Sequence, residues 1–249
     1  MTINKKDITI IIQGPLNKTS LDKLEHYVEF GKIIVSHWAE DSLDLQQQLI
    51  EAQVKYSNIS SISSSDPPDP YDHPGLIGSV QKKDYRYHQF QSTHEALKIC
   101  KTKYAIKTRS DEYWLGLEPL LEKFSEDDNK MVTSNVFCKP YYPQPYHISD
   151  HLMLAKTDLF LESLEMIAIN ERETLNVVAT ECTFGIGFLH AKHGEKLPTN
   201  KESFEKDFAY VNINEFKGYL VRWNTPPRGP KLVWQKPEGL EYMGENGVV

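Results

Sequence analysis

A run of charged residues, Lys107 to Glu112, directly follows the apolar residues Tyr104 to Ile106. The apolar residues predict a buried strand, so the charges begin where that strand leaves the core. At such a strand end, the carboxylate of Asp111 could bind Mn²⁺ or Mg²⁺ beside a nucleotide diphosphate. Lys107 and Arg109 could add fixed positive charge to stabilise a diphosphate leaving group. The alternative interpretation is a solvated charged turn.

A second polar group, His147 to His151, precedes the apolar segment Leu152 to Ala155. His147 and Ser149 could contact a phosphate or an acceptor sugar, and Asp150 could act as a general base. A local turn stabilised by Ser and Asp side chains is an equally good interpretation. The spacing of the two histidines does not by itself predict a zinc site.

Two further positions are candidates for binding or catalysis. Glu181 lies before the apolar segment Phe184 to Leu189, so burial could raise its pKa toward a useful value for a base. It could equally be a glutamate at the start of a helix. The sequence Gln13-Gly14-Pro15 lacks the spacing of a P-loop or a dinucleotide fingerprint. Gln13 could instead contact a nucleotide base or ribose, or the segment could be a simple tight turn.

Alternating strands and helices are predicted around these residues. Buried strands are expected at Ile8–Ile12, Lys32–Ser36 and Ile59–Ile62. Helices are expected from Thr19 or Ser20 through Phe30 and from Asp41 to Val54. This order predicts a parallel sheet with right-handed crossovers, whose carboxyl-end loops form the ligand crevice. Gln13 and Ser36 should therefore converge there.

The later elements are less regular. We expect a helix over Asp84–Cys100, a strand near Met131–Asn135 and a helix beginning at Thr157 or Asp158, whereas Phe184–Leu189 could be helix or strand. Ser63 to Val80 contains too many prolines and glycines for an element interior, and is either an active-site loop or a surface linker. The proline-rich tail after Thr225 predicts an extended arm.

Composition bounds the class of protein. The 249 residues, 39% of them hydrophobic, fit one α/β domain with extensions. The net charge of −7 argues against nucleic acid as a partner, because such binding needs a positive surface. Three scattered cysteines indicate reduced thiols in a cytoplasmic protein. No apolar run reaches the roughly 18 residues of a transmembrane helix, which leaves peripheral membrane contact open.

Several motifs, taken in order, resemble the WavE-type lipopolysaccharide-synthesis family over residues 8 to 190. The motifs are Ile10-Ile11-Ile12-Gln13-Gly14-Pro15, Ile34-Val35-Ser36-His37-Trp38, Asp72-His73-Pro74-Gly75, Gln89 with Ser92-Thr93, Lys107 to Asp111, and His147 to Asp150. The resemblance implies a GT-A-like fold: an α/β protein with a Rossmann-like, mostly parallel central sheet flanked by helices. It also implies one catalytic domain at 1–225, with a donor half at about 1–115 and an acceptor half at about 116–225, and an irregular arm at 226–249.

The resemblance also implies an activity. The expected reaction is transfer of a sugar from a nucleoside diphosphate sugar to a hydroxyl of a glycan or lipid-linked acceptor. Asp111 matches the strand-end aspartate, and Arg109 stands where the Asp-x-Asp motif of that fold has its first acid. The predicted roles are donor or acceptor binding for Gln13, Gly14, Pro15, Ser36, Asp72, Gln89, Lys107, Arg109, His147 and Ser149, cation binding for Asp111, and base for Glu181 or Asp150.

Two other functions fit parts of the sequence. A nucleotidyltransferase could share the sheet and the carboxylate, but no early phosphate loop rich in Gly, Arg and Lys is present. A noncatalytic glycan-binding protein is supported by the 13 Tyr and 4 Trp residues, whose rings could stack on sugars. These aromatic residues could equally well belong to the core.

Overall fold

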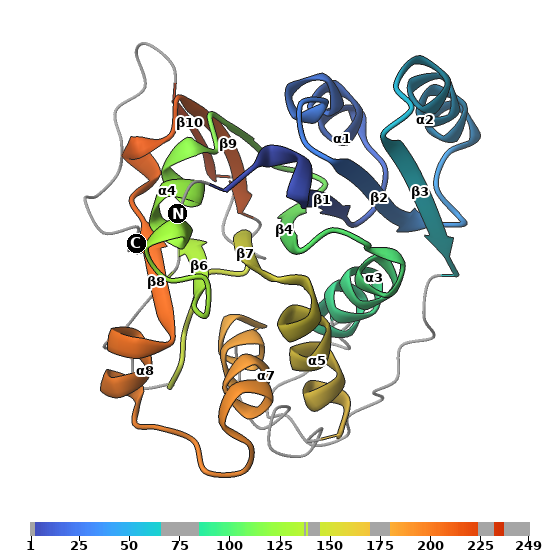
Figure 1. The fold of residues 1–249 in the computed structure, drawn as a ribbon. Coiled ribbons are helices and arrows are strands. Elements are labelled where there is room, and N and C mark those ends of the chain that lie inside the picture. Colours follow the sequence, from blue (N-terminus) through green and yellow to red (C-terminus); the bar gives the residue numbers. More distant parts are fainter. Residues whose placement is uncertain are drawn as a thin grey trace.

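A seven-stranded sheet forms the centre of the protein (Figure 1). The computed structural model describes residues 3–65, 85–136, 138, 145–169, 180–223 and 232–236. Within these residues the strands of the central sheet lie in the order β3-β2-β1-β4-β7-β6-β8. Their bounds are β1 Ile8–Gln13, β2 Lys32–Trp38, β3 Ile59–Ser64, β4 Tyr104–Arg109, β6 Met131–Ser134, β7 Leu152–Lys156 and β8 Phe208–Val211.

Most neighbouring strands of this sheet are parallel. β1 pairs in parallel with β2 and β4, β2 with β3, and β6 with β8. Only β7 runs against its neighbours β4 and β6 in the described sheet. Antiparallel neighbours need no crossover helix between them, unlike the parallel pairs. The predicted α/β class with a mostly parallel, Rossmann-like central sheet is confirmed.

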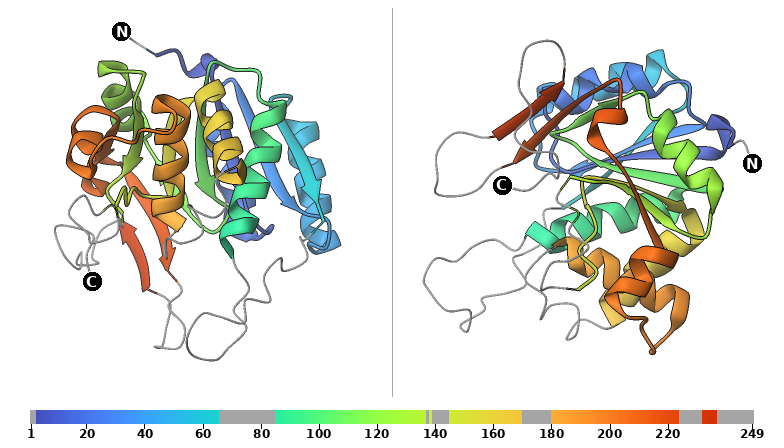
Figure 2. Two further views of the ribbon diagram at one scale, coloured as in Figure 1. Left: turned by 90° about the horizontal axis from the view of Figure 1, so that it is seen from below. Right: turned by 90° about the vertical axis from the view of Figure 1, so that its left-hand side faces the viewer.

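Helices cover both faces of the sheet. The bounds are α1 Lys18–Asp22, α2 Leu43–Lys55, α3 Tyr85–Ile99, α4 Glu118–Glu126, α5 Thr157–Ile169, α7 Thr180–His193 and α8 Asn200–Lys206. Figure 2 shows α3, α5 and α7 side by side over one face. Apolar side chains of α1, α2 and α4 pack in the core cluster of the other face. Ile10 and Ile12 of β1 join this cluster and Ile11 joins the opposite one, because successive strand residues alternate between faces.

The predicted helix from Thr19 or Ser20 to Phe30 is wrong in its start and its continuity. The N-cap is Asn17, whose side chain accepts a hydrogen bond from the Ser20 backbone at 2.9 Å. The α-helix ends at Asp22, and a 3₁₀ helix, η2, follows at Leu24–Tyr27. In a 3₁₀ helix, side chains three residues apart align, so Leu24 and Tyr27 are both buried.

The segment Phe184–Leu189, which could have been helix or strand, lies within the helix α7. Two glycines let this helix pack closely against its neighbours. A Cβ at Gly185 would lie 2.2 Å from the carbonyl oxygen of Tyr146, and one at Gly187 would lie 2.5 Å from that of Ser163. Larger residues at either position would therefore force α7 away from this face of the protein.

A small antiparallel sheet stands apart from the central one. It contains β5 Tyr113–Leu115, β9 Gly218–Trp223 and β10 Leu232–Lys236 in the order β10-β9-β5. β10 lies within the predicted arm at 226–249, whose other residues are outside the described part of the chain. Residues 66–84 also lie outside the described part of the chain. They contain most of the predicted loop Ser63–Val80, including Asp72.

Candidate active site

The ends of three parallel strands bring Gln13, Ser36 and Arg109 together. In the strand register, Gln13 pairs with Ser36 on one side and with Arg109 on the other. All three therefore lie at the carboxyl edge of the sheet, where α/β proteins usually bind ligands. The register confirms the predicted convergence of Gln13 and Ser36.

The side chains of Gln13 and Ser36 are both buried against α3. Ser92 of α3 donates its hydroxyl to Gln13 Oε1 at 2.9 Å, while the Ser36 hydroxyl donates to the Ser92 carbonyl at 2.7 Å. These bonds join the ends of β1 and β2 to the middle of α3. Both residues thus form the floor under this edge of the sheet.

Gly14 and Pro15 continue from Gln13 across the turn that follows β4. Gly14 has a φ of 116°, and a Cβ there would lie 2.7 Å from Ser110 Oγ. The Ser110 backbone N–H donates to the Gln13 carbonyl at 2.8 Å. A glycine is therefore required for both its backbone conformation and the close approach of the two segments.

Arg109, Asp111 and Glu112 form an ionic cluster on this turn. Arg109 Nε and Nη2 lie 3.1 and 3.2 Å from the two carboxylate oxygens of Asp111, and Nε lies 3.2 Å from Glu112 Oε1. Burial favours neutral Asp111, but the guanidinium outweighs this effect and keeps the pKa of Asp111 below its ordinary value. Asp111 and Arg109 remain partly exposed, whereas Glu112 is fully buried.

His151 completes the cluster from the segment before β7. Its Nδ1 lies 2.5 Å from Glu112 Oε1, and its Nε2 lies 3.6 Å from Asp150 Oδ1. Burial alone would lower the pKa of His151, but the charges of Glu112 and Asp150 raise it above the ordinary value. The ring therefore favours the protonated form and acts as a buried cation between two carboxylates.

Lys107, Gln89 and Asp150 form a second, deeper group. The fully buried Lys107 ammonium donates to the Asp150 carbonyl and, at 3.3 Å, to Gln89 Oε1. Burial lowers the pKa of Lys107 to about 8. Burial would raise the pKa of Asp150, but His151, Lys107 and Arg109 lower it to about 2. Lys107 and Gln89 thus fix the segment that carries Asp150.

Glu181 lies in the first turn of α7, where its carboxyl group feels the charge of Asp150. Burial, followed by the charge of Asp150, raises the pKa of Glu181 to about 7. A carboxyl group with this pKa can accept and release a proton near neutral pH, as a general base requires. Asp150 is a much weaker base than Glu181 because its pKa is so low.

His147 and Ser149, predicted to bind substrate, are both buried in the segment before β7. Ser149 Oγ lies 3.1 Å from Ser134 Oγ of β6, and the His151 backbone N–H lies 3.4 Å from Ser149 Oγ. These contacts connect Ser149 to the neighbouring strand and to His151. Ser149 is thus fixed between β6 and the backbone of His151.

The described residues do not fit the predicted cation at Asp111. Both carboxylate oxygens of Asp111 are bound to Arg109, and Oε1 of Glu112 is bound to Arg109 and His151. Among the residues that the structure describes, no group of three or more His, Cys, Asp or Glu side chains could hold a metal ion. In this structure the positive charge beside Asp111 is therefore that of Arg109.

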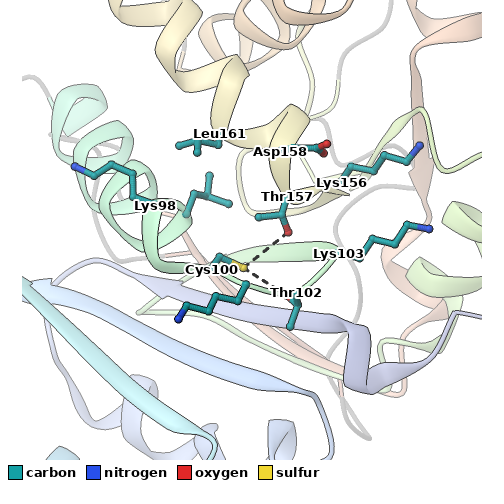
Figure 3. Close-up of a pocket in the computed structure, with 10 residues that line it drawn as sticks. Lys98, Cys100, Thr102, Lys103, Lys156, Thr157, Asp158 and Leu161 are labelled. Atoms are coloured by element: carbon teal, nitrogen blue, oxygen red, sulfur yellow. Dashed lines mark hydrogen bonds between the residues drawn. The ribbon is translucent and has the colours of Figure 1, made fainter.

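A cavity of about 570 Å³ lies at the opposite edge of the sheet (Figure 3). It lies around the start of β4 and the end of β7, where Cys100 Sγ is 3.4 Å from Thr102 Oγ1 and 3.8 Å from Thr157 Oγ1. The amino groups of Lys98 and Lys156 point in different directions in this view. The lysines do not converge on one point, so we place the site at the carboxyl edge instead.

Sequence reasoning missed three residues of this site. Glu112 and His151 stood inside the selected motifs but received no role, because their pairing depends on the contact between β4 and β7. Lys23 gave no sequence signal at all, since a lone lysine in a short helix usually faces solvent. In the structure it is buried, and its ammonium donates to the carbonyls of Arg109 and Glu112.

The sequence profile of a family described as WavE lipopolysaccharide synthesis matches residues 8–179. The chain belongs to this family. The membership confirms the resemblance from which a GT-A-like form of the α/β fold was expected. No curated protein sequence matches the chain.

Solved structures that resemble this chain in part include several transferases. A mannosyltransferase from Pyrobaculum calidifontis, in complex with GDP-Man and Mn²⁺, is 13% identical over 62% of this chain and 45% of its own, with a TM-score of 0.42. The galactosyltransferase LgtC, with donor and acceptor sugar analogues, is 13% identical over 72% and 70%, with a TM-score of 0.48. A putative glucose-1-phosphate thymidylyltransferase from Bacillus anthracis is 12% identical over 82% and 86%, with a TM-score of 0.46.

The chain spans about half the length of three solved structures that it resembles: 45% of the mannosyltransferase, 54% of S. aureus TarS 1-349 and 44% of the glycosyltransferase GlyE from Streptococcus pneumoniae. Within the described residues, none of the helices has the length and apolar character needed to cross a bilayer.

Proposed function

We propose that this chain is a glycosyltransferase that moves a sugar from a nucleoside diphosphate sugar to a hydroxyl of a glycan or lipid-linked acceptor. Membership of a lipopolysaccharide synthesis family supports a role in surface polysaccharide synthesis. The observation that carries the proposal is the cation Arg109 at the carboxyl edge of the sheet. The start of α7, whose Phe184 ring lies 5.3 Å from the Lys107 ammonium, brings the carboxyl group of Glu181 to the same part of the protein. Transfer of a glycosyl group from a diphosphate needs both functions, a base for the acceptor and positive charge for the leaving group.

The proposed reaction inverts the anomeric centre. Glu181 takes the proton of the acceptor hydroxyl, and the resulting oxygen nucleophile forms the new bond to the anomeric carbon. The bond between that carbon and the diphosphate oxygen breaks, and the electron pair leaves with the nucleoside diphosphate. Arg109, oriented by Asp111, stabilises the growing negative charge on the diphosphate. In this assignment Asp150 raises the pKa of the base rather than acting as the base.

The remaining predicted residues receive supporting roles. Gln13, Gly14 and Pro15 border the turn 109–112, so a nucleotide at this edge would pass beside them. Gln89, Lys107, Ser36 and Ser149 hold the floor of the site. His147 is assigned to the same buried segment, and Asp72 remains a predicted donor contact. We assign the donor to the half at about 1–115 and the acceptor to the half at about 116–225.

Location and cation use belong to the same proposal. We place the reaction in the cytoplasm, at the membrane surface when the acceptor is lipid-linked. The arm predicted at 226–249 is not wholly separate from the catalytic domain, because its strand β10 pairs with β9, which pairs with β5. No step is assigned to Mn²⁺ or Mg²⁺, because Arg109 already binds both oxygens of Asp111. Titrating either ion into exhaustively chelated enzyme, while following donor turnover, measures whether a cation is used.

The test begins with binding and proceeds to turnover. Thermal unfolding is followed with UDP, GDP, ADP and dTDP, because a ligand that binds only the folded state raises the apparent stability. Sugar conjugates of the stabilising nucleotide are then incubated with membranes or delipidated polysaccharide as acceptors. Release of a nucleoside diphosphate supports the proposal. Release of pyrophosphate from a nucleoside triphosphate and a sugar phosphate would indicate a nucleotidyltransferase, and binding of glycans without either product would indicate a binding protein.

A further inference from the structure

Lys23 is a buried lysine whose partners are main-chain carbonyls. It follows α1, and only 1% of its surface is exposed. Its ammonium donates to the carbonyl oxygen of Arg109 and, at 2.5 Å, to that of Glu112. No carboxylate among the described residues lies within ion-pair distance of this nitrogen.

These two carbonyls belong to the first and last residues of one turn. The Glu112 backbone N–H donates to the Arg109 carbonyl at 3.3 Å, which closes the turn. Between them lie Ser110, packed on Gly14, and Asp111, bound to Arg109. Lys23 therefore joins both ends of the segment that presents Arg109 and Asp111 at the rim of the site.

A second contact from the same part of the chain continues this support. The Tyr27 hydroxyl of η2 donates to the Trp114 carbonyl at 3.0 Å and accepts from the Trp114 backbone N–H at 3.1 Å. Tyr27 and Trp114 are both buried. Lys23 and Tyr27 thus bind the backbone of three residues between 109 and 114, namely Arg109, Glu112 and Trp114.

The chemistry of Lys23 is specific for holding carbonyl groups. Two carbonyl oxygens that point to the same place repel each other, and a buried cation between them removes this repulsion. An apolar side chain of similar length would fill the same space without the desolvation cost of an ammonium group. Burial lowers the pKa of Lys23 to about 7; the nearby charges of Glu112 and Asp111 favour the ammonium, and those of Arg109 and Lys107 oppose it. The amino group keeps hydrogens to donate to both carbonyls in either protonation state.

We propose that Lys23 is a positioning residue for the donor diphosphate, because it holds the turn 109–112 and thereby orients Arg109 and Asp111. This inference rests on the proposed function for its catalytic consequence, but the contact itself can be tested without substrate. Lys23 touches no reacting atom, so it acts only through the backbone of the turn.

The test compares Lys23→Met with Lys18→Met. Both variants replace a lysine of the same α1 region, but Lys18 is exposed and pairs only with Asp22 among the described residues. We expect amide hydrogen exchange in peptides covering 109–115 to become at least tenfold faster in Lys23→Met, with no change in peptides covering α4. Lys18→Met should match the wild type in both regions. Unchanged exchange at 109–115 in Lys23→Met would overturn the inference.

Kinetic measurements then test the catalytic consequence, with the donor sugar nucleotide that the thermal-unfolding screen selects. We expect kcat/KM to fall at least tenfold in Lys23→Met, with a larger loss in kcat than rise in KM, because the leaving diphosphate gains charge in the transition state. Faster exchange with unchanged kcat/KM would remove the positioning role. If no donor is turned over by the wild type, the proposed function fails while the exchange result still decides the contact. Should Lys23→Met not fold, Lys23→Gln replaces it with the same two outcomes.

Discussion

Glu112 and His151 form a buried ion pair in which Oε1 lies 2.5 Å from Nδ1. The pair connects the turn after β4 to the segment before β7, two parts of the chain separated by 39 positions. Arg109 binds the same carboxylate oxygen at 3.2 Å. One carboxylate oxygen therefore holds two cationic side chains at the carboxyl edge of the sheet, so the stability of the fold should depend on Glu112.

Glu112→Gln should strongly destabilise the protein. The substitution removes the counter-charge that the buried His151 imidazolium shares with the partly exposed Arg109 guanidinium, and breaking a buried ion pair typically costs about 3–5 kcal/mol of unfolding free energy. Urea unfolding of both proteins measures the loss. Glu25→Gln, which removes the exposed partner of Lys55, is the matched control and should leave the midpoint unchanged. Equal midpoints for Glu112→Gln and wild type would contradict the role of this pair.

The same pair predicts a dependence of stability on pH. The pKa of His151 is raised on folding, so its protonation stabilises the folded state. This contribution is fully present below the unfolded pKa of about 6.5 and is lost as pH rises through the folded value. Unfolding free energies measured from pH 5 to 9 should therefore show a decline in the wild type that is smaller in Glu112→Gln. Parallel curves for the two proteins would count against a charged His151.

Glu181→Gln should remove the proposed base. We expect kcat to fall about 10²- to 10⁴-fold, the usual contribution of general base catalysis. In the wild type, kcat/KM should rise with pH through about 7 as Glu181 loses its proton, and this rise should be absent in the variant. Glu162→Gln, at an exposed position of α5, is the control and should keep both rate and pH profile. A wild-type profile retained in Glu181→Gln would show that another group is the base.

Much of the fold was predictable because its signals are local. The β-branched run Ile8–Ile12 and the segment Lys32–Ser36 fall within observed strands, and strand–helix alternation predicted the parallel pairing. The same rule placed Gln13, Ser36 and the residues after β4 at one edge. The helix after Pro15 was harder to predict. Its N-cap is Asn17 and not Thr19 or Ser20. Its change to a 3₁₀ helix accompanies the hydrogen bond of Tyr27 to Trp114, which the sequence does not show.

The site was less predictable because its important contacts join distant segments. No local pattern pairs Glu112 with His151, or Lys23 with the carbonyls of the turn 109–112. The raised pKa of Glu181 was expected from the apolar residues that follow it, but the contribution of Asp150 requires the packing of α7 against the segment before β7. Arg109 and Asp111 are only two positions apart, but their spacing does not show that the guanidinium binds both carboxylate oxygens.

Asp150→Asn should change the pH profile rather than abolish the reaction. The Asp150 carboxylate raises the pKa of Glu181 in addition to the effect of burial. Removing this charge while keeping the size of the side chain should move the rise in kcat/KM to lower pH. The measurement is the pH dependence of kcat/KM between 5 and 9, with folding checked by near-ultraviolet circular dichroism. A rise at the wild-type position would show that the two carboxylates do not interact.

Gly185→Ala should disturb the base without touching it. The new Cβ would lie 2.2 Å from the Tyr146 carbonyl oxygen, a distance that no relaxation of a flexible side chain can relieve, because the obstacle is backbone. Tyr146 itself is held at a φ of 59° and is tied down by bonds of 2.7 Å from its backbone N–H to Asn200 and from its hydroxyl to the Pro198 carbonyl. The helix α7 must therefore move, and Glu181, one helical turn earlier on α7, moves with it.

For Gly185→Ala we expect a loss of about 1–3 kcal/mol in unfolding free energy, typical of overpacking, together with a fall in kcat. Ala191→Ser, on a partly exposed part of the same helix, is the control for a small change in side-chain size. Wild-type stability and turnover in Gly185→Ala would mean that α7 is not held against Tyr146 as closely as these contacts require.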